Sequence, residues 1–208
     1  MLYKYPRTPH LPWSEGVTDD DKILKDINVF KNKEIHITEK MDGENTTLYP
    51  KYYHARSLDS ADHESQHWLK NFYSGIKHMI PEGFRICGEN LFAKHSIYYE
   101  KLYDYFMVFS VWENNKCLSC DDTTLFCLEL GLSEVPYLYQ GIFNEEFLKN
   151  MKFNSKCGNE VEGYVIRNSE SFYLDEFQDN VAKYVRKNHV QTDEHWKNQK
   201  LVKNQLER

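Results

Sequence analysis

The sequence lacks a long hydrophobic run, an apolar leader and an excess of positive charge. No stretch approaches 18 consecutive apolar residues, so we expect no membrane contact. The first thirteen residues contain no apolar segment of the kind found in secretion signals. The net charge of −6, from 26 basic and 32 acidic side chains, excludes a purely electrostatic nucleic-acid binder. Any nucleic acid would therefore have to bind at a local basic surface.

Cysteine and glycine are also scarce. The five cysteines form an odd, scattered set in a chain without an export signal, which predicts reduced thiols and a cytoplasmic location. Cys117 and Cys120 have the spacing of a zinc-ligand pair, but no second pair follows at a regular distance, so we favour a structural role. The 9 glycines stand against 15 tyrosines and 12 phenylalanines, which favours a β-rich or mixed structure. With 208 residues, 40% of them hydrophobic, we expect one folded domain.

The hydrophobic pattern predicts short strands with helices inserted between them. Apolar side chains at helical spacing over residues 68–80 predict an amphipathic helix, closed by Pro81 and Gly83. Residues 34–39 (EIHITE) alternate between apolar and polar, which is typical of a half-buried strand. Further strands are expected over residues 46–49, 52–57, 84–91, 105–113, 116–119, 135–139, 162–168 and 181–186, and further helices over residues 18–30, 121–130 and 144–151. This order predicts an α+β fold with antiparallel sheets.

The two ends of the chain differ from its middle. We assign residues 1–188 to a single domain and residues 189–208 to a C-terminal tail. Prolines in residues 1–16 predict an extended N-terminal arm. From residue 181 onward basic side chains outnumber acidic ones. We expect the tail to be helical, either as a solvated surface or as a contact for nucleic acid.

The most informative segment is residues 40–45, KMDGEN, which follow the predicted strand 34–39. A lysine at the end of a strand, directly before Asp42 and Gly43, has two interpretations. The segment could be an ordinary hairpin turn with Lys40 as a solvated flank, because Asp-Gly is common in such turns. Alternatively, the turn could hold the lysine amine in a fixed position for chemistry. Lys-x-Asp-Gly by itself does not decide between them.

Other segments follow Lys40 in a specific order. Carboxylates occur on two later strands, Glu89 in RICGEN and Glu162 in VEGYVI, and a lysine, Lys183, occurs in VAKYV. An apolar strand over residues 105–111 lies between the two carboxylates. This series resembles the ordered motifs of the covalent nucleotidyltransferases, the ATP-dependent polynucleotide ligases and capping enzymes. Within that group it is most similar to the RNA ligases, through Asn45 and through residues 88–99 (GENLFAKHSIYY). The resemblance covers residues 34–187.

The resemblance implies a fold and a set of roles. The fold would be a nucleotidyltransferase (ATP-grasp-like ligase catalytic) domain of antiparallel sheets with flanking helices. Lys40 would be the nucleophile, Lys183 the cation on the α-phosphate, and Glu162 the acid that holds Mg²⁺ or Mn²⁺. Glu89 would contact the ribose hydroxyls or support the metal, and Phe109 would stack on adenine, with Phe106 as the other candidate. The remaining nucleotide-binding positions would be Glu39, Asp42, Gly43, Asn45 and Arg56.

The chemistry of a lysine nucleophile explains these residue types. A free lysine amine has a pKa of about 10.4 and is almost entirely protonated at neutral pH. Burial and cationic neighbours lower such a pKa, so we expect Lys40 to be activated in this way. Charge that develops on the phosphate requires a metal ion and a second cation. Carboxylates such as Glu162 are suitable ligands for that metal, because Mg²⁺ binds one or two carboxylates together with phosphate oxygens.

The sequence departs from the family pattern in two places. The last motif often has two lysines at Lys-x-Lys, but Val181 takes the first position, so the second phosphate-binding cation is unassigned. Ser110 follows Phe109 where many ligases have aspartate. The chain also leaves no room after residue 187 for the OB-fold that DNA ligases and capping enzymes carry. We therefore expect a minimal catalytic domain, which a protein partner could complete.

The preferred interpretation is a cytoplasmic, ATP-dependent RNA ligase or RNA-repair enzyme. It would form a lysyl-AMP intermediate on Lys40, transfer AMP to an RNA 5′-phosphate and seal this end to a 3′-hydroxyl. One alternative is a catalytically silent module that binds nucleic acid on the same scaffold. Another is a DNA ligase with the same chemistry.

Overall fold

Two β-sheets face each other in the computed structural model, which describes residues 2–56, 64–187 and 200–207. The first sheet has the strand order β11-β9-β1-β8, and the second has the order β10-β6-β5-β4-β2-β3, with β7 beside β5. Neighbouring strands are antiparallel except β5 and β7. The strands are β1 (Glu34–Lys40), β2 (Glu44–Leu48), β3 (Tyr53–Ala55), β4 (Phe84–Asn90), β5 (Phe106–Glu113), β6 (Lys116–Cys117), β7 (Ser133–Glu134), β8 (Tyr137–Ile142), β9 (Gly163–Asn168), β10 (Phe172–Tyr173) and β11 (Val181–Val185).

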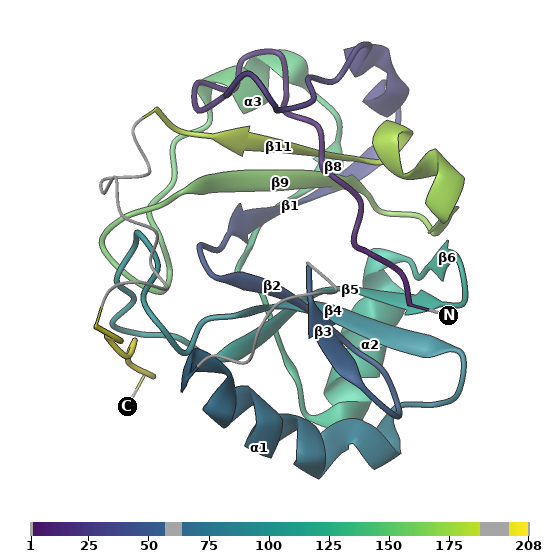
Figure 1. Cartoon of the computed structure of the whole chain (residues 1–208). Helices are drawn as coiled ribbons and strands as arrows, with labels where there is room; N and C mark the ends of the chain where they lie inside the picture. The colour runs from purple at the N-terminus through teal and green to yellow at the C-terminus, as the bar shows by residue number, and fades with distance from the viewer. Residues whose placement is uncertain (1, 57–63, 188–199, 208) are drawn as a thin grey trace.

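Helices cover the outer faces of the two sheets (Figure 1). The helices α1 (His67–Ile76) and α2 (Cys120–Leu130) pack on the second sheet, where Leu69 of α1 and Cys127 of α2 join the same apolar cluster. The helix α3 (Glu145–Asn150) and the 3-10 helix η1 (Ile27–Phe30) cover the first sheet. The other short 3-10 helices are η2 (Glu64–Gln66), η3 (Lys77–Met79) and η4 (Leu174–Asp179). The outer faces are filled with apolar side chains, and the faces turned toward each other carry both polar side chains and an apolar cluster, which includes Cys87 of β4 and Val181 of β11.

The alternation of side chains in β1 shows how this arrangement arises. Ile35 and Ile37 are fully buried in the cluster under α3, whereas His36, Thr38 and Lys40 are half-buried on the opposite face. Successive residues of a strand point to opposite faces, so the pattern of the sequence fixes which side chains face the second sheet. The lysine of the motif is therefore placed between the sheets.

The α+β fold with antiparallel sheets is confirmed, and so are most predicted elements. Helix α2 begins after Ser119, whose hydroxyl accepts from Asp122 N, and ends at Gly131, which has a positive φ of 65°. The described residues include no helix that is long and apolar enough to cross a membrane.

Two local predictions were wrong, and the hairpin interpretation of the lysine segment is excluded. Residues 18–26 are not helical, and only the 3-10 turn η1 forms at the end of the predicted segment 18–30. Residues 41–43 do not close a hairpin, because β1 and β2 belong to different sheets and the segment crosses between them. Residues 200–207 are extended, with bridges from Lys203 to Ala93 and from Leu206 to Leu102, because their backbone groups pair with those of the loop after β4. The rest of the predicted tail helix, residues 189–199, lies outside the described residues.

Candidate active site

A cavity of about 480 Å³ lies between the two sheets, and Lys40 lines it. Strands β1, β9 and β11 supply its wall on one side, and Phe109 of β5 and the beginning of α2 supply the other. The antiparallel register places Thr38 beside Val165, and Val165 beside Lys183. Lys40 pairs with Gly163 in the next row, so Lys40 and Lys183 lie close together on one face of the sheet.

The amine of Lys40 forms an ion pair with Glu162, at an Nζ–Oε2 distance of 2.7 Å. Only 24% of the Lys40 side chain and 7% of the Glu162 side chain are exposed. Glu162 directly precedes β9, and its carbonyl accepts from Arg186 N at the end of β11. The ion pair thus joins the end of β1 to the residue before β9, and its two residues are 122 positions apart in the sequence.

Glu89 approaches the same amine from the second sheet. Strand β4 pairs with β2 so that Glu89 lies opposite Asn45, and Glu89 Oε1 accepts from Gly43 N at 3.2 Å. The segment from Lys40 to Asn45 crosses between the sheets at this point, which brings Glu89 and Glu162 together around one lysine. A Cβ on Gly43 would lie 2.6 Å from the Asn90 carbonyl oxygen, so this close approach requires glycine.

The electrostatics of this cluster contradict the expected activation of Lys40. Burial lowers the pKa of the Lys40 amine, but the carboxylates of Glu162, Glu89 and Asp42 outweigh burial, and the pKa is raised. Burial raises the pKa of Glu89 to about 8, against the opposing effect of Lys40 and with further contributions from Glu162 and Asp42. The sequence analysis expected burial and cationic neighbours to lower the pKa of Lys40, whereas the fold surrounds the amine with carboxylates that raise it.

The pKa of Lys183 shifts in the opposite direction and is lowered. Burial lowers its pKa, and Lys40 is the next largest cause. Its amine lies 3.7 Å from Asp21 Oδ1, an ion pair that the sequence reasoning did not foresee. Lys183 is thus close enough to Lys40 to act on the same ligand.

Asp42 supports the neighbouring loop and does not line the cavity. Its Oδ2 accepts from Ser96 N and Ile97 N, both at 2.7 Å, and its own backbone N–H donates to the hydroxyl of Tyr99. These bonds attach the segment after Lys40 to the loop after β4. Asp42 therefore has a positioning role in this structure.

Glu39 lies on the other face of β1 from Lys40. Its carboxylate accepts from Ser155 Oγ at 2.6 Å and from Lys156 N at 3.2 Å, which holds the side chain on that face, although the residue borders the first cavity. Burial raises the pKa of this carboxyl. Direct binding of a nucleotide by the Glu39 side chain would require these bonds to break.

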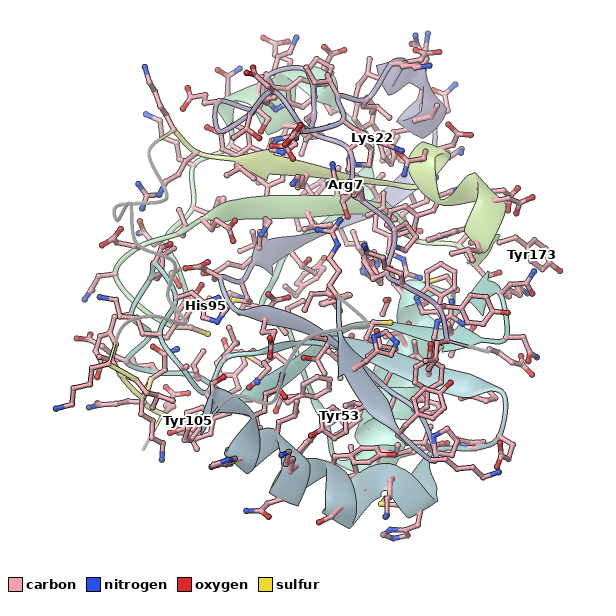
Figure 2. All side chains as sticks on the ribbon, in the orientation of Figure 1. Arg7, Lys22, Tyr53, His95, Tyr105 and Tyr173 are labelled. Atoms are coloured by element: carbon pink, nitrogen blue, oxygen red, sulfur yellow. The ribbon has the colours of Figure 1, made fainter. Side chains whose placement is uncertain are left out.

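A second, more polar cavity of about 620 Å³ begins at the same lysine. It shares Lys40, Asn45 and Glu89 with the first cavity, and Arg56 and Lys183 line it. Figure 2 labels three further side chains of its lining, Arg7 and Lys22 from the N-terminal segment and His95 from the loop after β4. Every predicted site residue except Asp42 and Glu162 thus lines at least one of the two cavities, and Lys40, the ion-pair partner of Glu162, lines both.

The two candidates for stacking on adenine, Phe109 and Phe106, lie in different places. Phe106 is fully buried and packs against Phe72 of α1, so it belongs to the core under the helices. Phe109 is half-buried and lines the first cavity. The preference for Phe109 agrees with this placement, because residues three apart in a strand face opposite sides.

The sequence reasoning missed several residues of the first cavity. Arg167 is buried, its Nε has no hydrogen-bond partner among the described residues, and it lies beside His36 in the register of β9 and β1. His36 lies four residues from Lys40, and Arg167 lies two residues from Val165. Residues at such even spacing share one face of a strand, so the sequence could have placed His36 and Arg167 on the face that lines the cavity. Tyr5 and Thr8 come from the arm, for which no periodicity gave a signal.

The donor set at the junction suits a hard divalent cation. The available groups are the carboxylates of Glu89 and Glu162 and the Asn45 Oδ1, which is buried without a hydrogen-bond partner among the described residues. All are oxygen ligands, the type that Mg²⁺ and Mn²⁺ prefer. The described residues contain no cluster of three His, Cys, Asp or Glu that could bind a metal alone. The site thus fits a metal that also binds substrate phosphates, and the five cysteines, all buried and unpaired, contribute no ligand cluster.

Comparisons with known proteins agree with this fold. Among solved structures, the chain is similar to Naegleria gruberi RNA ligase with PPi, at 19% identity and a TM-score of 0.59. It is also similar to two mutants of that ligase, one apo (17%, TM-score 0.60) and one with ATP and Mn (16%, TM-score 0.59). Each comparison covers 89% of this chain and 58% of the other, so this chain spans less than two thirds of their length.

A search of curated proteins found no match. A family model described as RNA ligase matches residues 33–185, which is most of the chain and includes Lys40, both carboxylates and Lys183. The chain therefore belongs to the RNA ligase family.

Proposed function

We propose that this protein is an ATP-dependent RNA ligase that forms a covalent lysyl-AMP on Lys40. The observation that carries the proposal is the position of the Lys40 amine. It lies at the junction of two cavities and is surrounded by Glu162, Glu89 and Lys183 from three distant segments. Membership in the RNA ligase family and the ATP and Mn named for similar structures support this proposal.

The first cavity has the size of a small-molecule site and would hold the nucleoside, with adenine against Phe109. The phosphates would then extend past Lys40 toward Lys183 and Arg56, both of which line the second cavity. Glu89 would accept from the ribose hydroxyls or support the metal. The metal ion, held by Glu162, would supply positive charge to the phosphates.

The chemical step requires the amine in its neutral form. Lys40 Nζ would attack the α-phosphorus, an N–P bond would form, the P–O bond to pyrophosphate would break, and the amine proton would be lost. Glu162, 2.7 Å away, is placed to accept that proton. AMP would then pass to an RNA 5′-phosphate, and a 3′-hydroxyl would displace it as the ends join.

Self-labelling tests this proposal directly. The protein is incubated with α-³²P-ATP and Mg²⁺ or Mn²⁺ and analysed on a denaturing gel. We expect a label that is lost in acid and survives alkali, as a P–N bond requires. Lys40→Ala should abolish the label, and Glu162→Ala should reduce it by at least ~10²-fold, the effect typical of a lost catalytic group. Lys33→Ala, at an exposed lysine before β1, is the matched control and should label normally.

Three results would contradict the proposal. A wild-type protein that never labels with any metal would indicate a silent binding module. Label retained in Lys40→Ala would place the nucleophile elsewhere. Sealing of DNA ends but not of matched RNA ends would make the enzyme a DNA ligase.

A further inference from the structure

The N-terminal arm is part of the wall of both cavities. Its residues Pro9 and Leu11 pair with β11, through Lys183 N to Pro9 O at 2.9 Å and Leu11 N to Lys183 O at 2.7 Å. Further toward the N-terminus, Tyr5 packs edge-on against Phe109 of the second sheet, with ring centroids 5.1 Å apart. Figure 1 shows the arm crossing from the first sheet to the second. The arm therefore spans the opening between the sheets and is fixed at both sides.

Two cationic side chains line the second cavity, Arg7 between these two anchors of the arm and Lys22 from the segment that follows the arm. Arg7 lines the second cavity, and its guanidinium donates to the Asp20 carbonyl at 2.9 Å. Lys22 lines the same cavity because residues 22–24 pair with His10, through His10 N to Lys22 O at 2.7 Å. Both side chains are exposed at its rim (Figure 2). They come from two segments that pair at His10 and line one cavity.

Asp21, which lines this cavity, already has partners, whereas Arg7 and Lys22 form no ion pair with an acid among the described residues. Asp21 accepts from the Thr18 hydroxyl and lies within ion-pair distance of His10 and Lys183. Among the described residues, no ion pair joins Arg7 or Lys22 to a carboxylate. The rim therefore offers positive charge to an anionic ligand that reaches Lys40.

We propose that Arg7 and Lys22 bind the β- and γ-phosphates of ATP and the pyrophosphate that leaves. This inference rests on the proposed function. A nucleoside in the first cavity, with its α-phosphate at Lys40, directs the remaining phosphates into the second cavity. Val181, where the second lysine of the last motif would stand, lines the first cavity and not the second, so β11 brings only Lys183 to the second cavity.

The chemistry of the leaving group matches these residues. Pyrophosphate gains negative charge as the P–O bond to the α-phosphate breaks, so cations placed at this position stabilise the transition state. A guanidinium donates two parallel hydrogen bonds to phosphate oxygens, and a lysine adds a compact point charge. The backbone that carries Arg7 is anchored on both sides, and the backbone of Lys22 pairs with His10, so both residues are brought to the cavity before the reaction.

The first test is binding and does not require activity. Affinities for ATP and AMP with Mg²⁺ are measured by calorimetry in the Lys40→Ala background, so that ATP is not consumed. Loss of Arg7 and Lys22 together (Arg7→Ala, Lys22→Ala) should weaken ATP binding by about 10-fold or more, the loss expected for charge-assisted phosphate contacts. AMP binding should change by less than ~2-fold, because AMP has no β-phosphate. Lys4→Ala and Lys25→Ala, at exposed lysines that line neither cavity, are the matched controls.

The second test distinguishes binding of the leaving pyrophosphate from binding of an RNA phosphate. The double variant should need about 10-fold more pyrophosphate to discharge its lysyl-AMP, but should seal pre-adenylated RNA at the wild-type rate. The proposal would be overturned if the double variant lost affinity for ATP and AMP equally. It would also be overturned if the control variants lost as much ATP affinity as the double variant. Normal ATP binding with impaired sealing would also overturn it, and would assign the arm to an RNA phosphate. A wild-type protein that never labels would contradict the ligase function, while the ATP/AMP comparison would still decide this inference.

Discussion

At the scale of single residues, the main feature is a lysine amine surrounded by acids. The ion pair between Lys40 and Glu162 holds the amine in its protonated form, the opposite of what a nucleophile needs. Lys183 and Arg56 line the second cavity together with Lys40 and Glu89. A ligand that brings positive charge to Glu162 and Glu89 would therefore also release the lysine from its ion pair.

The raised pKa of Glu89 predicts a cost in stability. The folded state keeps a proton on Glu89 up to about pH 8, whereas the unfolded chain releases it near pH 4.5. Stability should therefore fall as the pH rises through this window, and Glu89→Gln should remove that loss. We expect the variant to melt at least ~2–4 °C above the wild type at pH 8.5, equivalent to about 1 kcal/mol, and close to the wild type at pH 4.5.

Thermal unfolding of Glu89→Gln between pH 4.5 and 8.5 checks this prediction. The control is Glu113→Gln at an exposed position of the neighbouring strand β5. A difference in melting temperature that does not change with pH would contradict the proposed cause.

At the scale of elements, the site depends on the close packing of strands β9 and β11. Gly163 lies between Lys40 of β1 and Val185 of β11 in the register of the sheet. A Cβ at this position would lie 1.9 Å from the Tyr184 carbonyl oxygen, much closer than any contact allows. The backbone of β11 therefore has to move away if Gly163 gains a side chain.

Gly163→Ala should for this reason destabilise the fold and the site together. We expect a loss of more than ~2 kcal/mol, in the range of overpacked core positions, measured by urea unfolding. Gly75→Ala in α1 is the control, because its Cβ meets no atom within 4 Å. It should be neutral or stabilise by about 0.5–1 kcal/mol, since alanine favours helix. Similar effects at both positions would show that close strand packing at Gly163 is unimportant.

At the scale of the whole molecule, the C-terminal segment supports the loop that holds Asp42. Asn204 is almost fully buried, its Oδ1 accepts from Tyr99 N at 3.0 Å and its Nδ2 donates to the Leu91 carbonyl at 2.8 Å. The hydroxyl of Tyr99 in turn accepts from Asp42 N, next to the segment that follows Lys40. A continuous set of hydrogen bonds thus links residues 200–207 to the active-site segment.

Asn204→Ala should leave buried backbone groups of Tyr99 and Leu91 without partners. We expect a destabilisation of about 2–4 kcal/mol, from two groups at about 1–3 kcal/mol each with partial compensation by water. Gln205→Ala is the matched control, because the Gln205 side chain is exposed while its backbone makes the bonds to Tyr99 and Leu102. Denaturant unfolding measures both, and equal stability of the two variants would contradict the role given to Asn204.

The sequence by itself determined the strands, the principal helices and the order of the chemical residues. This was possible because alternation in β1 and helical spacing in α1 are local properties, and because Lys40, Glu89, Glu162 and Lys183 follow one another in a family order. The ends of α2 are likewise set locally, by the side-chain cap of Ser119 and by Gly131 with its positive φ.

Only the tertiary structure decided which groups meet. The pKa of Lys40 depends on carboxylates that come from β4 and from the residue before β9, and the roles of Asp42 and Glu39 depend on backbone groups in distant loops. The arm gave no periodic signal, because its backbone pairs with β11 irrespective of its side chains. Contacts between distant segments are set by the packing of two sheets, and no local pattern in the sequence encodes that packing.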